Sequence, residues 1–246
     1  MKKTMNPKEF KIGLYGASGK MGQAIEQLLI EDSTLVPYLA IGKSPSKVFS
    51  ISAKDLNQIE EEILEDIDVW IDFTSAEGLQ NLLAKTQKLK TAVVSGSTGL
   101  TDKDFANLKK ESAKRPLFWA SNLSPGLWAF RQAMKSFNLI SDFDFAIDET
   151  HHTQKKDRPS GTAQTLQADL EKIIQKKIET PASFRLGGVF GIHTVHAASA
   201  NEVITMQHQA LNRSVFAAGA LQAARWVVKQ KPGSYSMEHL FSNKGV

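Results

Sequence analysis

A glycine-rich loop near the start of the chain constrains the fold more than any other sequence feature. Residues 10–15 alternate apolar and other residues as a short strand does, and Gly16-Ala17-Ser18-Gly19-Lys20-Met21-Gly22 follows at once. A helical stripe comes next, formed by Ala24, Ile25, Leu28 and Leu29. Glycines in this strand-to-helix position let the backbone approach a pyrophosphate, while the helix N-terminus faces the phosphates. The loop therefore predicts a dinucleotide site, with a ligand-free glycine turn as the alternative.

The residues up to about 120 continue to alternate between strand and helix patterns. Short apolar runs at 35–41, 69–73, 91–95 and 117–120 predict strands, and 77–88 and 101–114 predict helices. Thr101 and Asp104 have the spacing that caps a helix start. This order is typical of a Rossmann-like, doubly wound parallel sheet with helices on both faces, and so of an α/β fold.

The pattern changes near residue 122, where we place a domain boundary. Ser124-Pro125 predicts a helix start, and a second helix is expected from the end of the loop 151–160 to about residue 177. Strands are expected at 143–148, 183–190, 193–198 and 202–209, followed by a last helix at 215–229. The second half is therefore predicted to be an α+β domain with an open mixed sheet.

Composition excludes several kinds of function. The 246 residues include no cysteine, which excludes thiol catalysis, Cys-ligated metals and disulfides and is compatible with a reducing cytoplasm. The formal net charge of +4 is too small to predict a nucleic-acid or membrane partner. The N-terminus lacks a signal-peptide pattern, and no stretch of about 18 apolar residues predicts a membrane span. We expect a soluble, cytoplasmic protein with a modest preference for anionic ligands.

The end of the second predicted strand bears on the choice of cofactor. An acidic residue there usually binds the ribose 2′-hydroxyl of NADH, and a cation accommodates the 2′-phosphate of NADPH. The strand ends in Ala40-Ile41-Gly42-Lys43-Ser44, with no carboxylate. Lys43 therefore favours NADPH, with Lys20 as a second candidate for the phosphate. A solvated Lys43 and use of NADH remain open.

Two further loops follow strands of the predicted sheet. They are Phe73-Thr74-Ser75 and Ser95-Gly96-Ser97-Thr98-Gly99. Open α/β sheets bind ligands at the carboxyl ends of their strands, so these loops and the first glycine loop are expected to outline one crevice. Ordinary turn chemistry is the alternative for each loop.

The stretch 149–163 gathers the residues that are best suited to acid–base chemistry. His151 and His152 stand side by side, three cations follow within six residues, and Ser160-Gly161-Thr162 begins a helix whose N–H groups could hold a carboxylate. This pattern predicts a small acidic substrate that is protonated near neutral pH. Exposed loop histidines are one alternative. A metal is not expected, because consecutive strand residues such as His151 and His152 face opposite ways.

These residues resemble a known family, the 4-hydroxy-tetrahydrodipicolinate reductases, also called dihydrodipicolinate reductases, of bacterial lysine and diaminopimelate biosynthesis. The family pattern E-x-H-H-x-x-K-x-D-x-P-S-G-T-A is met at every specified position from Glu149 to Ala163. The likeness extends over nearly the whole chain, through Gly16–Gly22, Asp72-Phe73-Thr74, Gly96–Gly99, Asn122-x-Ser124-x-Gly126, the segment from Arg185 through Gly191 and His193, and Arg213–Ala220.

The resemblance implies roles for individual residues. His151 resembles the family's acid/base and Lys155 its proton donor, while substrate contacts are implied for His152, Ser160, Gly161 and Thr162. The implied cofactor contacts are Gly16, Ala17, Ser18, Gly19, Lys20, Met21, Phe73, Gly96, Ser97, Thr98, Ala120, Ser121, Asn122 and Leu123, with Lys43 added from the strand-end argument. We expect the imidazole of His151 and the ammonium of Lys155 to share a cleft with the nicotinamide.

The resemblance also implies the domain arrangement and the assembly. Residues 1–122 and 213–246 would form the dinucleotide-binding domain, and 123–212 the substrate-binding and oligomerisation domain of a homotetramer. The implied substrate is a cyclic imine dicarboxylate that is reduced by NAD(P)H with loss of water. Leu123, Thr153 and Gln154 depart from the usual family residues.

Two other functions share parts of this pattern. An amino-acid or homoserine-type dehydrogenase would use the glycine loop but would not need the paired histidines. A non-catalytic dinucleotide sensor would keep the fold and bind NADPH without oxidising it.

Overall fold

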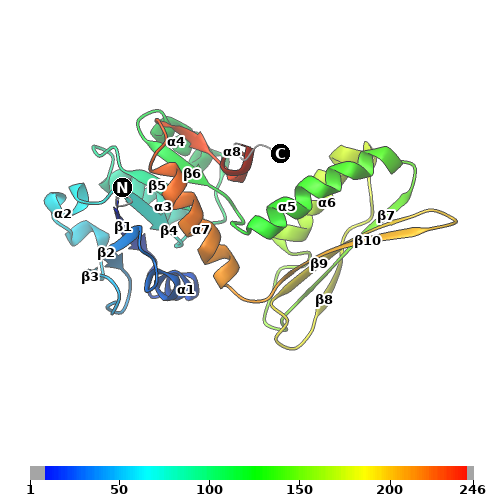
Figure 1. Cartoon of the computed structure of the whole chain (residues 1–246), viewed down its shortest axis with the longest axis horizontal. Helices are drawn as coiled ribbons and strands as arrows, with labels where there is room; N and C mark the ends of the chain where they lie inside the picture. Colours follow the sequence, from blue (N-terminus) through cyan, green and yellow to red (C-terminus); the bar gives the residue numbers. More distant parts are fainter. Residues whose placement is uncertain (1–8, 243–246) are drawn as a thin grey trace, which may run out of the picture. The chain divides into compact units, whose positions relative to one another are not determined.

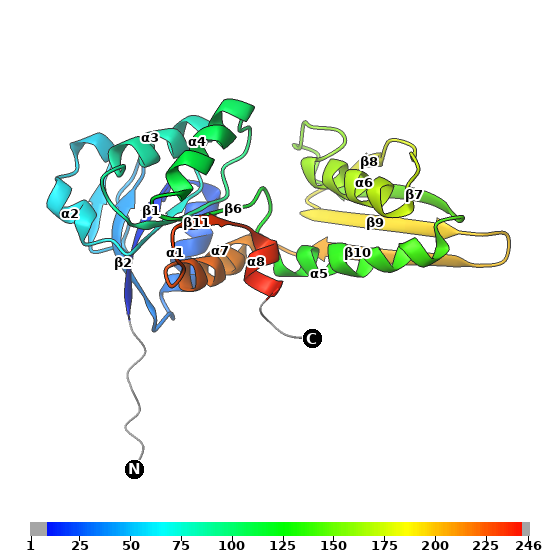
Figure 2. The same ribbon diagram turned by 90° about the horizontal axis from the view of Figure 1, so that it is seen from above.

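The computed structural model describes residues 9–242, which divide into two compact units (Figures 1 and 2). The first comprises Met1–Leu123 and Phe216–Val246, and the second Ser124–Val215. The sequence analysis placed these divisions after residues 122 and 212. No helix in the described part of the chain has the length and apolar character needed to cross a membrane.

The first unit is built on a seven-stranded sheet in which every strand pair is parallel. Its order is β11-β6-β5-β4-β1-β2-β3, and the strands are β1 (Phe10–Tyr15), β2 (Leu35–Ile41), β3 (Ile51–Ala53), β4 (Val69–Asp72), β5 (Ala92–Ser95), β6 (Pro116–Trp119) and β11 (Gly233–Tyr235). The order reverses between β1 and β4, which is the position where doubly wound sheets bind ligands. The predicted Rossmann-like class is confirmed.

Helices cover both faces of this sheet. Figure 2 shows α3 (Ala76–Lys85) and α4 (Asp102–Ser112) on one face, with α1 (Lys20–Leu29) and α7 (Ser214–Val227) on the other. The remaining elements are η1 (Leu56–Gln58), α2 (Glu61–Glu65) and α8 (Met237–Ser242). The predicted Thr101–Asp104 capping box is present at the start of α4. Trp70 and the leucines of α3 lie in the apolar core on one side, with no exposed surface beyond 1%.

The second unit is a four-stranded mixed sheet with helices on one face (Figure 1). The strand order is β10-β9-β7-β8, formed by β7 (Asp144–His151), β8 (Ala182–Arg185), β9 (Gly191–Ala198) and β10 (Val203–Ala210). Only the β7–β8 pair is parallel. The core lies between this sheet and the helical segments α5 (Pro125–Ala133), η2 (Met134–Ile140) and α6 (Gly161–Ile174).

The strands of the second unit differ from the predicted ranges in ways that affect the site. The strand expected at 143–148 continues to His151, so Glu149 and His151 belong to β7 and not to a loop. The strand expected at 183–190 ends at Arg185, and Gly187 follows with a positive φ of 47° in the turn to β9.

Candidate active site

Three loops of the first unit contact one another at the carboxyl ends of β1, β4 and β5. Gly16 has a φ of +93°, and a Cβ on it would lie 2.8 Å from the carbonyl oxygen of Phe73. A Cβ on Gly96 would lie 2.3 Å from the Phe73 ring. The structure thus brings together the loops that were expected to outline one crevice, and glycine is needed at both contacts because a side chain would overlap Phe73.

A buried carboxylate ties two of these loops together. Asp72, at the end of β4, accepts hydrogen bonds from the hydroxyl groups of Ser95 and Ser97, each at 2.7 Å, and from Thr74 Oγ1 at 2.5 Å. Burial raises the pKa of Asp72, and these hydrogen bonds counteract part of that effect. The N–H of Ser97 donates to Ser95 Oγ at 3.1 Å, and its carbonyl accepts from Trp119 Nε1 at 2.9 Å. Ser97 therefore fixes the loop through its side chain and its backbone, and its expected contact with the cofactor stays a prediction.

Lys43 follows β2 beside the glycine loop. Its backbone N–H donates to Ser18 Oγ at 2.9 Å, and a Cβ on Gly42 would lie 2.7 Å from the Ser18 nitrogen. The side chains of Lys20 and Lys43 are both exposed. Two cations therefore flank the glycine loop, and either could contact the phosphates of a dinucleotide that binds there.

The segment after β6 contributes in a more limited way. Ala120 donates its N–H to the Ser95 carbonyl at 3.2 Å, which places the start of this segment beside β5. The side chain of Leu123 is 2% exposed and belongs to the core. Any contact of Leu123 with a ligand would therefore come from its backbone.

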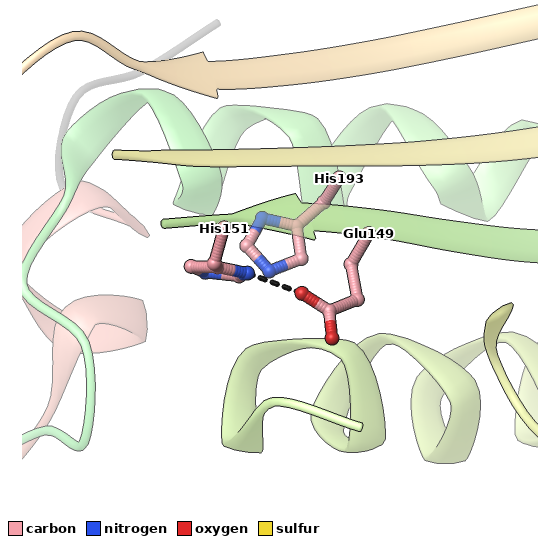
Figure 3. A group of neighbouring side chains, drawn as sticks. All are labelled: Glu149, His151 and His193. Atoms are coloured by element: carbon pink, nitrogen blue, oxygen red, sulfur yellow. Dashed lines mark hydrogen bonds and ion pairs between the residues drawn. The ribbon is translucent and has the colours of Figure 1, made fainter. Parts of the chain in front are cut away.

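The second unit gathers buried polar side chains on the helix-covered face of its sheet (Figure 3). Glu149 and His151 are two residues apart on β7 and point the same way, and His193 approaches from β9. A hydrogen bond joins His151 Nδ1 to Glu149 Oε2. The rings of His151 and His193 meet edge to face, with centroids 5.1 Å apart.

Arg185 connects this group to the loop that carries Lys155. Its guanidinium lies 2.9 Å from Glu149 Oε1, and both side chains are almost fully buried, at 3% and 0% exposed. Nε donates to the carbonyl of Lys155 at 3.1 Å, and Nη2 donates to the carbonyl of Asp157. Arg185 thus holds the 152–160 loop against β7.

Burial and these charges set the ionisation of the group. Burial alone would raise the pKa of Glu149, but hydrogen bonds that include those from Arg185 and His151 outweigh it and hold the pKa below its usual value. For His151, burial lowers the pKa, Glu149 raises it, and Lys155 and Arg185 lower it further, with a net decrease. Burial lowers the pKa of His193 to about 3, so this ring is neutral at physiological pH.

α6 begins at Gly161, where the sequence predicted a helix start, while the carboxylate site expected there stays a prediction. Ser160 caps the helix by accepting from the Ala163 N–H at 3.2 Å, and its hydroxyl lies 3.2 Å from His193 Nε2. Gly161 is exposed, and Thr162 is partly exposed. The structure therefore brings Ser160 into direct contact with the buried histidine group.

Lys155 and His152 lie beyond the end of β7. The ammonium of Lys155 forms an ion pair with Asp157 at 2.9 Å, and the Lys155 side chain keeps a quarter of its surface exposed. His152 is half-buried, and its carbonyl accepts from the Lys155 N–H at 3.1 Å. Asp157 thus pairs with the ammonium of Lys155, the group to which the resemblance assigns proton transfer. A substrate carboxylate would compete with Asp157 for this ammonium.

Glu149, His151 and His193 also have the composition of a metal site, since one ligand atom from each lies within 4.8 Å of the others. The two histidines that the sequence analysis considered as a metal pair, His151 and His152, do not form this group. Arg185 already neutralises the carboxylate of Glu149 at 2.9 Å. A dication here would face that guanidinium without a compensating negative charge, so the charges favour a proton-binding group.

Comparisons with known proteins agree with this geometry. The N-terminal part of the dihydrodipicolinate reductase family matches residues 10–123, and its C-terminal part matches residues 127–241. A 4-hydroxy-tetrahydrodipicolinate reductase from Bdellovibrio bacteriovorus is 45% identical over 96% of this chain and 98% of its own length. The chain belongs to the dihydrodipicolinate reductase family. It is an oxidoreductase, and the comparisons favour this reductase over the homoserine-type dehydrogenase and the dinucleotide sensor.

Further relatives extend the likeness to other bacteria. The 4-hydroxy-tetrahydrodipicolinate reductase of Stenotrophomonas maltophilia is 36% identical over 96% of this chain and 99% of its own. Among solved structures, a dipicolinate-bound dihydrodipicolinate reductase from Paenisporosarcina sp. TG-14 has a TM-score of 0.78 and 19% identity, covering 94% of this chain and 99% of that one. An amine dehydrogenase from Mycobacterium smegmatis has a TM-score of 0.60 at 9% identity, over 93% and 95%, so this reductase shares its fold with other dehydrogenases.

The sequence analysis assigned no role to Glu149, Arg185 or His193, although it quoted all three in the family pattern. One signal was available: Glu149 is two residues from His151, and residues at this spacing share a face if the strand continues. Arg185 and His193 stand 34 and 42 residues beyond His151, on other strands. Their convergence follows from the sheet order, which the sequence pattern did not reveal.

Proposed function

We propose that this reductase converts 4-hydroxy-tetrahydrodipicolinate, NAD(P)H and one proton to tetrahydrodipicolinate, NAD(P)⁺ and water, as named for its relatives, and that His151 and Lys155 manage the proton. The observation that carries the assignment of residues is the buried Glu149–His151 hydrogen bond beside the cap of α6. It places a titratable imidazole next to a helix start that suits a carboxylate.

The substrate site is proposed at the start of α6. The relative from Paenisporosarcina binds dipicolinate, a ring with two carboxylates. The backbone N–H groups of Gly161 and Thr162 would donate to one substrate carboxylate, which would replace the Asp157 carboxylate as the acceptor at Gly161. His152 and Lys155 would face the other charges. Substrate binding would draw Lys155 away from Asp157, its partner at 2.9 Å.

The dinucleotide, when bound, supplies the hydride. The chain's own residues then have three tasks: to hold the phosphates on the glycine loop, to orient the substrate, and to deliver a proton. Hydride addition leaves electron density on the ring, and protonated His151 would neutralise it through Nε2 while Lys155 stabilises the developing charge. Loss of the 4-hydroxyl as water completes the balance.

We also propose that NADPH is preferred, because no carboxylate follows β2 and Lys43 lies beside Ser18. Lys43→Ala should raise the KM for NADPH about 5- to 10-fold and leave that for NADH within about twofold, since an exposed charge-assisted contact contributes about 1–1.5 kcal/mol. Steady-state kinetics with both cofactors measures this. Lys47→Ala, which removes another exposed lysine of the same loop, is the matched control. Equal changes for both cofactors would refute the assignment to Lys43.

A homotetramer assembled through the open face of the four-stranded sheet is proposed as well. Phe184 and Val203 lie on the face opposite the core and are 56% and 67% exposed. Exposed large apolar side chains on an uncovered sheet face favour an interface between subunits. Sedimentation of the purified protein measures the number of subunits in the assembly. A cytoplasmic location is also proposed.

The activity itself is tested with a coupled reaction. Aspartate semialdehyde, pyruvate and the synthase that condenses them generate the unstable substrate, and the absorbance of NADPH reports its reduction. We expect the absorbance to fall only when the synthase and this protein are both present. Oxidation of NADPH without the synthase, or none with it, would overturn the proposed function.

A further inference from the structure

We propose that Glu149 is a positioning residue that holds the proton of neutral His151 on Nδ1, so that Nε2 is the atom that exchanges a proton with the substrate. The inference rests on the proposed function of His151 and assigns Glu149 and its partner Arg185 a part in it. Glu149 is wholly buried on β7, where its carboxylate contacts His151, Arg185 and the Ser160 N–H, all of them polar groups of the site.

The hydrogen bonds of Glu149 determine which nitrogen of His151 carries the proton. Oε1 accepts from the Arg185 guanidinium at 2.9 Å and from the Ser160 N–H at 3.3 Å. Oε2 is left to the Nδ1 atom of His151. An ionised carboxylate can only accept hydrogen bonds, so Nδ1 must donate. Neutral His151 therefore carries its proton on Nδ1 and has its lone pair on Nε2.

The other nitrogen of His151 is left open. Within residues 9–242, no protein group hydrogen-bonds to Nε2, and this atom is not among the buried polar atoms that lack a partner. Nε2 points towards Gly191, where a Cβ would lie only 3.1 Å away. Glycine keeps this side of the ring clear, and the edge-to-face contact with His193 holds the ring plane. The accessible nitrogen is thus the one that Glu149 does not use.

Glu149 also stabilises the protonated form of the ring. The charged groups that face His151 are Glu149 on β7, Arg185 on β8 and Lys155 in the following loop, while His193 on β9 is neutral. Two of these charges are positive, so Glu149 is the one group that favours an imidazolium. Without it, burial, Arg185 and Lys155 all act to lower the pKa of His151.

Glu149→Gln removes the negative charge of Glu149 and reverses its hydrogen bond to His151 with little change in the shape of the side chain. Arg185 needs an acceptor, so the amide oxygen would face Arg185, and the amide NH₂ would face Nδ1. The variant would select the opposite tautomer, with the proton on Nε2. Since the reductive step needs protonated His151, we expect kcat to fall at least about tenfold, and the limb where activity falls with rising pH to move to lower pH. The KM values for substrate and NADPH should stay within about twofold.

The tautomer of neutral His151 can be measured in the wild-type protein, without any variant of Glu149. In ¹⁵N-histidine-labelled wild-type protein, with the signal assigned by its loss in His151→Gln, NMR should show neutral His151 protonated at Nδ1. This measurement decides the proposal if Glu149→Gln does not fold. It is also independent of turnover, so a protein without reductase activity would refute the proposed function while the tautomer is still tested.

Glu111→Gln is the matched control. Glu111 is buried and forms a 2.6 Å ion pair with buried Arg115 in the first unit, whereas Glu149 belongs to the second. We expect this variant to lose stability but to keep the wild-type pH profile. The proposal is overturned if Glu149→Gln keeps the wild-type kcat and pH profile, if Glu111→Gln shifts the profile equally, or if neutral His151 carries its proton on Nε2.

Discussion

His151→Ala should lower kcat about 10²–10⁴-fold, the range that a positioned proton donor contributes, while the Kd for NADPH stays unchanged. The physical reason is that His151 is a buried imidazole at the end of β7 whose Nε2 makes no hydrogen bond to the described residues, whereas the loops proposed to bind the dinucleotide belong to the other unit. Single-turnover kinetics measures the loss in the chemical step, and the fluorescence of bound NADPH measures the affinity.

An exposed histidine provides the control for this experiment. His239 lies on α8 and hydrogen-bonds Ser236. His239→Ala removes the same ring and should retain wild-type turnover. If His151→Ala also turned over at the wild-type rate, His151 would have no part in the mechanism, and Lys155 would be the remaining candidate for the proton donor.

The parallel sheet was predictable because it depends on local patterns that recur. β2 and β6 are continuous apolar runs, β4 and β5 each begin with three apolar residues, and β1 alternates apolar residues with others. Apolar runs of this kind are typical of parallel strands that are buried on both faces. The strands that the prediction missed, β3 and β11, have only three residues each and lie at the two edges. These two strands are recognised only by their hydrogen bonds to a neighbouring strand, because three residues are too few to show an alternation of apolar and polar side chains.

The candidate site was predictable only in part, for a related reason. The family pattern identified His151, Lys155 and Ser160 along the chain, but the predicted strand ended at residue 148 and the predicted loop began at residue 151. The structure continues β7 through His151, and pairing with β8 and β9 then buries Glu149 beside Arg185. Burying a single charged side chain costs free energy unless an opposite charge lies beside it. The burial of Glu149 and of Arg185 can therefore be explained only once the sheet order shows that they pair.

Gly22→Ala should weaken NADPH binding, because this glycine sets how closely α1 approaches the loop. A Cβ at Gly22 would lie 2.3 Å from the carbonyl oxygen of Ala17 and 2.4 Å from that of Gly16. Both contacts are to backbone atoms, which cannot rotate away as a side chain could. The loop or the helix must therefore move, and overpacking of this kind costs about 1–3 kcal/mol.

If half or more of that cost falls on the bound form, the Kd for NADPH should rise about 2- to 150-fold. The remaining cost should appear as a lower melting temperature. Fluorescence titration and thermal denaturation separate the two parts. Gly188→Ala is the control, because a Cβ there would meet nothing within 4 Å and the residue has no positive φ. Wild-type affinity in Gly22→Ala, with a folded protein, would place the dinucleotide elsewhere than on the first glycine loop. The displaced backbone carries the very N–H groups that a pyrophosphate needs, so a bound cofactor cannot tolerate the shift without losing those contacts.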